Sequence, residues 1–122
     1  MPWDISSERS VYLQLVDIIK QKIMSGEYEP GQRMPSVREL AADAAVNPNT
    51  MQRALTELER EGLLYTQRTS GRFVSEDAGM IDGLRLSGAE ERTRAFYQEM
   101  VQNGLSADEV RRLLEKAIAE TK

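Results

Sequence analysis

The stretch from Ser36 to Arg60 limits the fold more than any other part of the chain, because it carries the signals of two short helices joined by a tight turn. Ser36 and Glu39 are spaced as a capping box, in which each side chain accepts a hydrogen bond from the other residue's backbone amide. Asn47 can cap a second helix, and Pro48 suits the first helical position, where no amide donor is needed. This spacing predicts one helix that begins after Ser36 and another that begins at Pro48.

Both helices place apolar residues on one face, as a helix packed on a core does. These residues are Val37, Leu40, Ala41 and Ala44 on the first helix, and Met51, Ala54, Leu55 and Leu58 on the second. The opposite face of the second helix is polar and carries Asn49, Gln52, Arg53 and Thr56. Asn and Gln can pair with adenine and Arg with guanine, so this face suits readout of a DNA major groove. A face that only contacts solvent is the alternative interpretation.

After the second helix the apolar period falls to two, which is typical of strands. The two predicted strands are Leu63 to Thr66 and Phe73 to Val74. They flank a polar tip that contains Gly71, with Arg68 and Arg72 on either side. Basic residues at such a tip can contact phosphates or enter a minor groove. Three helices followed by this hairpin make a winged helix; a hairpin that only closes the domain is the alternative.

A further helix is predicted from about Ser10 to Ser25, where apolar residues follow helical spacing and Gly26 supplies the stop. It would be the first of the three helices that precede the hairpin. The short stretch from Trp3 to Ile5 is compatible with a strand.

Composition narrows the class of function. A chain of 122 residues suits one domain, or one small domain with an extension. It has no Cys and no His, which removes thiol nucleophiles, His-based acid–base catalysis and the usual zinc sites. We therefore expect no enzyme activity, no catalytic residues, no cofactor and no metal site. No apolar run reaches membrane-spanning length and the start lacks a secretory pattern, which favours a cytoplasmic protein without membrane partners.

The net charge of −4 argues against nucleic-acid binding, because nucleic-acid-binding domains tend to be basic. The charge is unevenly distributed, however. Residues 33–72 hold six Arg and five acidic residues, whereas residues 76–122 hold 10 acidic and seven basic ones. Three of the five central acids lie between Glu57 and Glu61, near the far end of the second helix, so they need not face phosphates.

Four stretches together resemble the DNA-binding domain of GntR-family transcription regulators. They are Tyr12 to Leu15, Pro30 to Ala41, Val46 to Leu55 and Leu58 to Leu63. The resemblance covers about Val11 to Val74 and implies DNA contacts from Arg38, from the start of the following helix, and from a wing with Gly71. The DNA-binding residues expected on this basis and from the face described above are Arg33, Ser36, Arg38, Asn47, Pro48, Asn49, Thr50, Gln52, Arg53, Arg68, Gly71 and Arg72.

The segment 76–122 is too short for the large effector domains of most of that family, and it resembles the YtrA-like branch instead. Capping boxes at Ser87 with Glu90 and at Ser106 with Glu109 predict two helices. Three glycines make residues 76–88 a weak helix former, so a short or broken linker helix is expected there.

The two helices cannot cover their own apolar faces, and isolated helices of this length are marginal in water. We expect a second copy of the chain to cover them, the alternative being a hairpin that folds back on the winged helix. The expected dimerisation residues are Phe96, Tyr97, Met100, Val110, Leu113, Leu114, Ala117 and Ile118.

The sequence thus predicts a mainly α fold with a small β wing: a winged helix-turn-helix in residues 1–75 and a short helical dimerisation extension in residues 76–122. The expected function is that of a homodimeric, sequence-specific transcription repressor on double-stranded DNA with an inverted-repeat operator. A winged-helix module for protein or RNA is the alternative. A small-molecule effector would have to bind at the dimer seam or between the domains, and no residue set indicates its chemistry.

Overall fold

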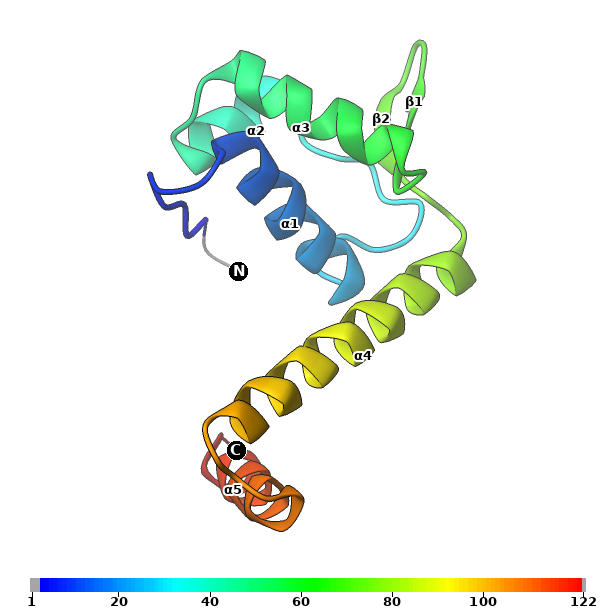
Figure 1. The fold of residues 1–122 in the computed structure, drawn as a ribbon. Coiled ribbons are helices and arrows are strands. Elements are labelled where there is room, and N and C mark those ends of the chain that lie inside the picture. Colours follow the sequence, from blue (N-terminus) through cyan, green and yellow to red (C-terminus); the bar gives the residue numbers. More distant parts are fainter. Residues whose placement is uncertain (1–2, 122) are drawn as a thin grey trace. The chain divides into compact units, whose positions relative to one another are not determined.

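The computed structural model describes residues 3–121 and has five helices and one two-stranded antiparallel sheet in this range (Figure 1). In chain order the elements are α1 (Val11–Met24), α2 (Val37–Ala44), α3 (Pro48–Arg60), β1 (Leu64–Gln67), β2 (Gly71–Val74), α4 (Ala78–Gln102) and α5 (Ala107–Thr121). This confirms the mainly α fold with a small β wing. The chain divides into two compact units, Met1–Leu84 and Arg85–Lys122.

The predicted start signals of α2 and α3 are confirmed. Glu39 N donates to Ser36 Oγ at 3.1 Å while Ser36 N donates to Glu39 Oε1 at 3.2 Å, which completes the capping box of α2. Asn47 Oδ1 accepts a hydrogen bond from Asn49 N at 2.7 Å at the start of α3. Between the helices Ala45 adopts a left-handed conformation with φ of 57°, which turns the chain sharply. The starts of α2 and α3 and the turn between them therefore agree with the local signals in the sequence.

The core of the first unit lies where α1, α2, α3 and the hairpin meet. Its largest fully buried side chains are Leu15, Ile19, Ile23, Met51, Leu55, Leu58, Leu63 and Val74. All four residues predicted for the apolar face of α3 are buried, and on α2 Val37 packs at the edge of the core beside three buried residues. Burial of this face of α3 leaves its polar face directed to solvent.

The hairpin pairs Leu64 with Val74 at one end and Gln67 with Gly71 at the other. Gly71 thus lies inside β2, opposite Gln67, and the tip consists of residues 68–70. The segment before α2 adds backbone bonds to β2, since Met34 N donates to Arg72 O at 2.8 Å. The hairpin is therefore anchored along β2 as well as at its base.

The segment before α1 forms no strand in residues 3–10, so the strand considered at Trp3 to Ile5 is wrong. Side chains hold this segment instead. The Trp3 indole Nε1 donates a hydrogen bond to Asp43 Oδ2 at 2.7 Å, and the Lys22 ammonium lies 4.3 Å from the centroid of the Trp3 ring. Because these partners are distant in the sequence, the local pattern of residues 3–5 could not predict the conformation of this segment.

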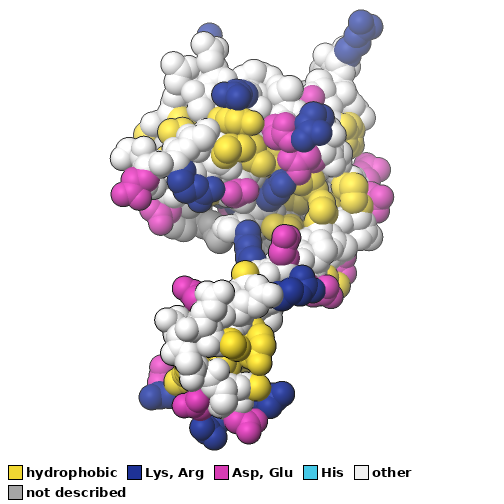
Figure 2. Space-filling view, in the orientation of Figure 1, with side chains coloured by type: hydrophobic (Ala, Val, Ile, Leu, Met, Phe, Trp, Pro, Cys, Tyr) yellow, Lys and Arg dark blue, Asp and Glu magenta, His cyan; other side chains and the backbone are white. Residues whose placement is uncertain are grey.

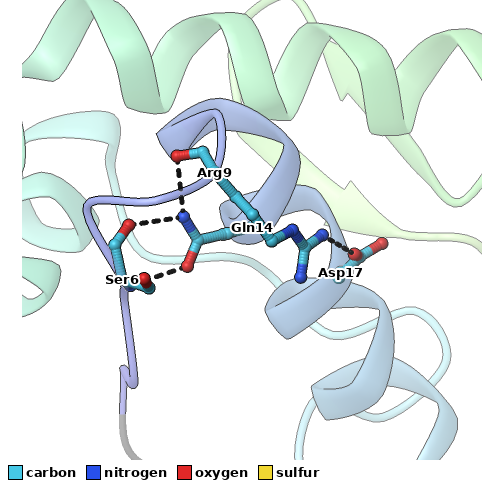
Figure 3. A network of polar contacts seen from close by, with 4 residues as sticks. All are labelled: Ser6, Arg9, Gln14 and Asp17. Atoms are coloured by element: carbon cyan, nitrogen blue, oxygen red, sulfur yellow. Dashed lines mark hydrogen bonds and ion pairs between the residues drawn. The ribbon is translucent and has the colours of Figure 1, made fainter.

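Gln14 fixes the approach to α1 (Figure 3). Its side chain is 6% exposed, and its amide is saturated by backbone groups. Oε1 accepts from Ser6 N at 2.7 Å, while Nε2 donates to Ser6 O at 2.7 Å and to Arg9 O at 3.0 Å. A buried amide with all these bonds made holds the start of α1 in one place.

Helix α4 differs from its prediction, because it runs without a break from Ala78 to Gln102. The capping box expected at Ser87 and Glu90 and the broken linker helix are both wrong. Asp77 caps the helix instead, since Met80 N donates to Asp77 Oδ1 at 2.9 Å, and Ile81 is 6% exposed in the core of the first unit. Burial of Ile81 offsets the cost of about 1 kcal/mol that each glycine imposes inside a helix.

In the second unit the capping box of α5 is confirmed. Glu109 N donates to Ser106 Oγ at 3.2 Å and Ser106 N donates to Glu109 Oε1 at 2.9 Å. Gly104, with φ of +90°, ends the preceding helix, and the two helices form a hairpin around Val110, which is 6% exposed.

Across residues 3–121, none of the helices combines the length and the apolar character needed to cross a membrane.

Candidate DNA-binding surface

The polar face of α3 is open to solvent. Asn47, Pro48, Asn49, Gln52 and Arg53 are all exposed, and these residues lie in the cap and the first two turns of the helix. Gln52 Nε2 donates to Thr56 Oγ1 at 3.1 Å, so its amide lies along the helix surface, while Thr50 is only half-buried. The arrangement presents amide and guanidinium groups at the N-terminal end of a helix, the part that reads base edges in helix-turn-helix proteins.

Four of the predicted arginines have no acidic partner within residues 3–121. These are Arg33, Arg38, Arg53 and Arg68, and all four are exposed. Arg38 lies on the first turn of α2, next to Ser36, whose hydroxyl is occupied by the capping box. A guanidinium without a carboxylate keeps its full charge and its donors for an external anion.

The acids at the far end of α3 are neutralised within the protein. Glu57 pairs with Arg60, with Nε to Oε1 at 3.0 Å, and the hydrogen bond from Arg60 lowers the pKa of Glu57. Lys20 Nζ lies 2.6 Å from Glu61 Oε1. The negative net charge of the chain is therefore a poor guide to the surface at the start of α3.

Glu59 connects α3 to the wing. Its Oε1 accepts hydrogen bonds from Arg72 Nε at 2.6 Å and from Thr66 Oγ1 at 2.5 Å. Partial burial raises the pKa of Glu59, but these two hydrogen bonds and the charge of Arg72 outweigh it, so the pKa lies below its ordinary value. Sequence reasoning gave Glu59 no role, because its partners lie on strands that periodicity alone does not align with α3.

The two wing arginines occupy different environments. Arg68 is exposed in the turn at the tip, whereas the Arg72 side chain is 17% exposed and bound to Glu59. Gly71 has φ of +109°, and an added Cβ there would lie 3.3 Å from Arg33 Nε. The structure thus brings Arg33 against the wing at Gly71 and keeps Arg72 within the protein.

Tyr12 on α1 also belongs to this surface, although it was not among the DNA-binding residues expected from the sequence. The Arg53 guanidinium carbon lies 3.8 Å from the centroid of the Tyr12 ring. Together they line a shallow hollow of about 400 Å³ between the starts of α1 and α3, with Ser10, Val11, Asn49 and Thr50. The only signal in the sequence was a large aromatic at the edge of the helical stripe, which does not identify its partner.

Figure 2 shows basic side chains, in dark blue, at the outer end of the hairpin and over α2 and α3. No group of three or more Asp or Glu residues in the described range is arranged to hold a metal ion.

The second unit exposes apolar side chains over α5 and the end of α4 (Figure 2). Of the predicted dimerisation residues, Phe96, Tyr97, Leu113, Leu114 and Ile118 are 41–57% exposed. Ala117 is also exposed, Met100 is half-buried, and Val110 is buried inside the hairpin. Leu86 and Val101 are 53% and 45% exposed, although neither was among the expected dimerisation residues.

Comparison with known proteins agrees with this geometry. The model of the bacterial regulatory proteins of the gntR family matches residues 11–74. The HTH-type transcriptional repressor YtrA of Bacillus subtilis (strain 168) is 31% identical over 121 residues, which cover 98% of this chain and 92% of YtrA. A GntR family transcriptional regulator from Listeria monocytogenes has a similar structure, with a TM-score of 0.87, 36% identity, and coverage of 92% of this chain and 98% of that one. The DNA-binding domain of AraR, solved in complex with operator ORR3, matches 58% of this chain and 88% of that one at 32% identity and a TM-score of 0.51.

Proposed function

The chain belongs to the gntR family of bacterial regulatory proteins, as a YtrA-like regulator. We propose that it is a homodimeric repressor that binds an inverted-repeat operator. The proposal is supported by the exposed polar start of α3, together with four exposed arginines that have no acidic partner in the described residues: Arg33, Arg38, Arg53 and Arg68. YtrA is described as a repressor, and AraR was solved with operator DNA. As a bacterial gene regulator it would act in the cytoplasm.

In the proposed complex α3 enters a major groove with its N-terminal end. Asn49, Gln52 and Arg53 then reach base edges, since amides suit adenine and guanidinium groups suit guanine. Arg38 on α2 would neutralise a phosphate beside the groove. Such a contact adds affinity for any sequence and makes binding sensitive to salt.

The wing would contact the DNA backbone through Arg68, whose side chain is exposed at the tip. We assign Arg72 a different role within the same surface, which is to hold the hairpin against α3 through Glu59. Arg33, packed beside Gly71, would extend the basic surface from the wing towards α2.

The second unit would form the dimer. Fully burying one Leu, Ile or Phe side chain contributes about 1.5–3 kcal/mol. Five of the predicted dimerisation residues on α4 and α5 are more than 40% exposed in each copy: Phe96, Tyr97, Leu113, Leu114 and Ile118. A two-fold dimer joins the same surface of both copies, so one set of exposed residues serves both sides. Two tethered α3 helices would then act on adjacent half-sites at high effective concentration, and the operator would share the protein's two-fold symmetry.

A winged-helix module for protein or RNA remains the second candidate, because the net charge is −4. The unpaired arginines around α3 favour DNA over this alternative. Selection of binding sites from random duplex DNA by the full chain separates the two. We expect an inverted repeat to emerge, with affinity that falls steeply as salt rises; an absence of any enriched sequence would contradict the proposal.

The dimer has its own test with matched variants. Leu113→Glu and Ile118→Glu each place a carboxylate in the exposed apolar surface, while Ala119→Glu places one on the exposed opposite side of α5. Light scattering at micromolar concentration should give a dimer for the unmodified chain and for Ala119→Glu, and a monomer for the other two. A monomeric unmodified chain would contradict the dimer.

A further inference from the structure

We propose that Tyr12 is a positioning residue of the DNA-binding surface: its ring holds the Arg53 guanidinium flat at the start of α3 and keeps it away from the acids of the same helix. This inference rests on the proposed function and assigns a role to a residue of α1 that is outside the helix-turn-helix itself. Its basis is the position of the Arg53 guanidinium carbon, which lies over the Tyr12 ring at 3.8 Å from the centroid.

The ring is the fixed member of the pair. Tyr12 is half-buried and packs against the core, and α1 begins at Val11 just beyond the backbone that Gln14 holds at Ser6 and Arg9. Arg53 by contrast is exposed, and its long side chain can adopt many rotamers in solvent. A rigid aromatic surface beneath it restricts these rotamers before DNA arrives, which lowers the entropy lost on binding.

The contact with Tyr12 also keeps Arg53 from pairing with Glu57. Glu57 follows Arg53 by one helical turn, a spacing at which side chains of opposite charge can pair. In this structure Glu57 bonds to Arg60 instead, and no carboxylate of residues 3–121 pairs with Arg53. Arg53 therefore has no ion-pair partner among the described residues for two reasons: its guanidinium lies over the Tyr12 ring, and Glu57 is already paired with Arg60.

Stacking leaves the edges of the guanidinium free. A cation over a ring face uses its flat side, while its N–H donors point outward in the plane and can still form two parallel bonds to guanine or phosphate. The hollows on either side of the stack are open, one towards Asn49 and Thr50 and the other towards Thr56 and Arg60. Arg53 thus lies between them with its donors accessible from solvent.

A double-mutant cycle on operator affinity tests the role. Tyr12→Leu removes the ring and Tyr12→Phe keeps it, and each is measured in the native chain and with Arg53→Ala. We expect Tyr12→Leu to weaken binding about 2- to 5-fold in the native background, the factor that an exposed cation–ring contact supports, and to have no further effect with Arg53→Ala. Tyr12→Phe should bind as the native chain does. Because Tyr12 packs on the core, each variant is first checked to be fully folded by urea titration.

Two further measurements keep this role distinct from a structural one. In the free protein, NMR should find the Arg53 side-chain protons shifted by the ring in the native chain and in Tyr12→Phe, and unshifted in Tyr12→Leu. Glu57→Gln added to Tyr12→Leu should restore part of the lost affinity, because the competing carboxylate is gone.

Equal weakening by Tyr12→Leu with and without Arg53 would overturn the inference, as would unshifted Arg53 protons in the native chain. If the native chain selects no DNA sequence while the NMR shift is present, the proposed function fails and the positioning role fails with it. If DNA binding is specific but the cycle is additive, only the role of Tyr12 is lost.

Discussion

Alanine substitution of the two wing arginines should change different properties of the protein: stability for Arg72 and DNA binding for Arg68. Arg72→Ala removes the partner of Glu59, whose side chain is 29% exposed and retains only the bond from Thr66. Loss of a hydrogen bond to a charged group that is largely out of solvent costs about 1–2 kcal/mol of unfolding free energy. For a unit of this size that corresponds to a fall in melting temperature of about 4–8 °C for each kcal/mol. Arg68→Ala removes an exposed side chain without a partner and should leave stability unchanged.

The pH dependence of this loss has a definite sign. The pKa of Glu59 in the folded chain is below its ordinary value of 4.5, because the bonds from Thr66 and Arg72 outweigh partial burial. A depressed pKa contributes stability that is present above the unfolded value and is lost as pH falls through the folded one. The difference between the native chain and Arg72→Ala should therefore be full at pH 7 and shrink as pH falls below 4.5.

Circular dichroism during urea and thermal unfolding measures the stability of both variants, and fluorescence anisotropy with the selected operator measures their binding. Arg68→Ala should lower the slope of log affinity against log salt by about 0.9 for each bound copy, as loss of one phosphate contact does. A stability of Arg72→Ala equal to that of the native chain at pH 7 would contradict the role of Arg72 in holding the hairpin. Unchanged operator affinity and salt slope for Arg68→Ala would contradict a phosphate contact by Arg68.

Three other substitutions probe the rest of the surface. Arg38→Ala should weaken binding to all DNA sequences alike and lower the salt slope, measured by anisotropy; a loss confined to one base pair would instead make it a base contact. Ser36→Ala removes the cap of α2 and should cost about 0.5–2 kcal/mol in urea unfolding, with Ser70→Ala in the exposed tip as a neutral control. Gly71→Ala should destabilise the hairpin, because φ is +109° and the added Cβ would crowd Arg33; an unchanged melting temperature would contradict this.

The helix-turn-helix and the hairpin could be predicted from the amino-acid sequence. The capping box of α2, the cap at Asn47 and the buried face of α3 depend on groups within one or two turns of each other, so spacing along the chain was sufficient to predict them. The same holds for Ser106 and Glu109 at the start of α5. The residues of the polar face were predicted for the same reason, since a buried stripe on one side of a helix specifies what faces solvent on the other.

Contacts that join distant segments of the chain depend on the tertiary structure and could not be predicted from the sequence. Nothing near Arg72 in the chain indicates Glu59, and nothing near Tyr12 indicates Arg53. Trp3 likewise donates its hydrogen bond to Asp43, 40 residues further along the chain. Helix α4 makes the same point for secondary structure, because its glycines and the serine signal at Ser87 predicted a break that burial of Ile81 and the Asp77 cap prevented. Local propensities amount to about 1 kcal/mol per residue, so a single buried side chain or a cap can reverse them, and which side chain is buried depends on the whole fold.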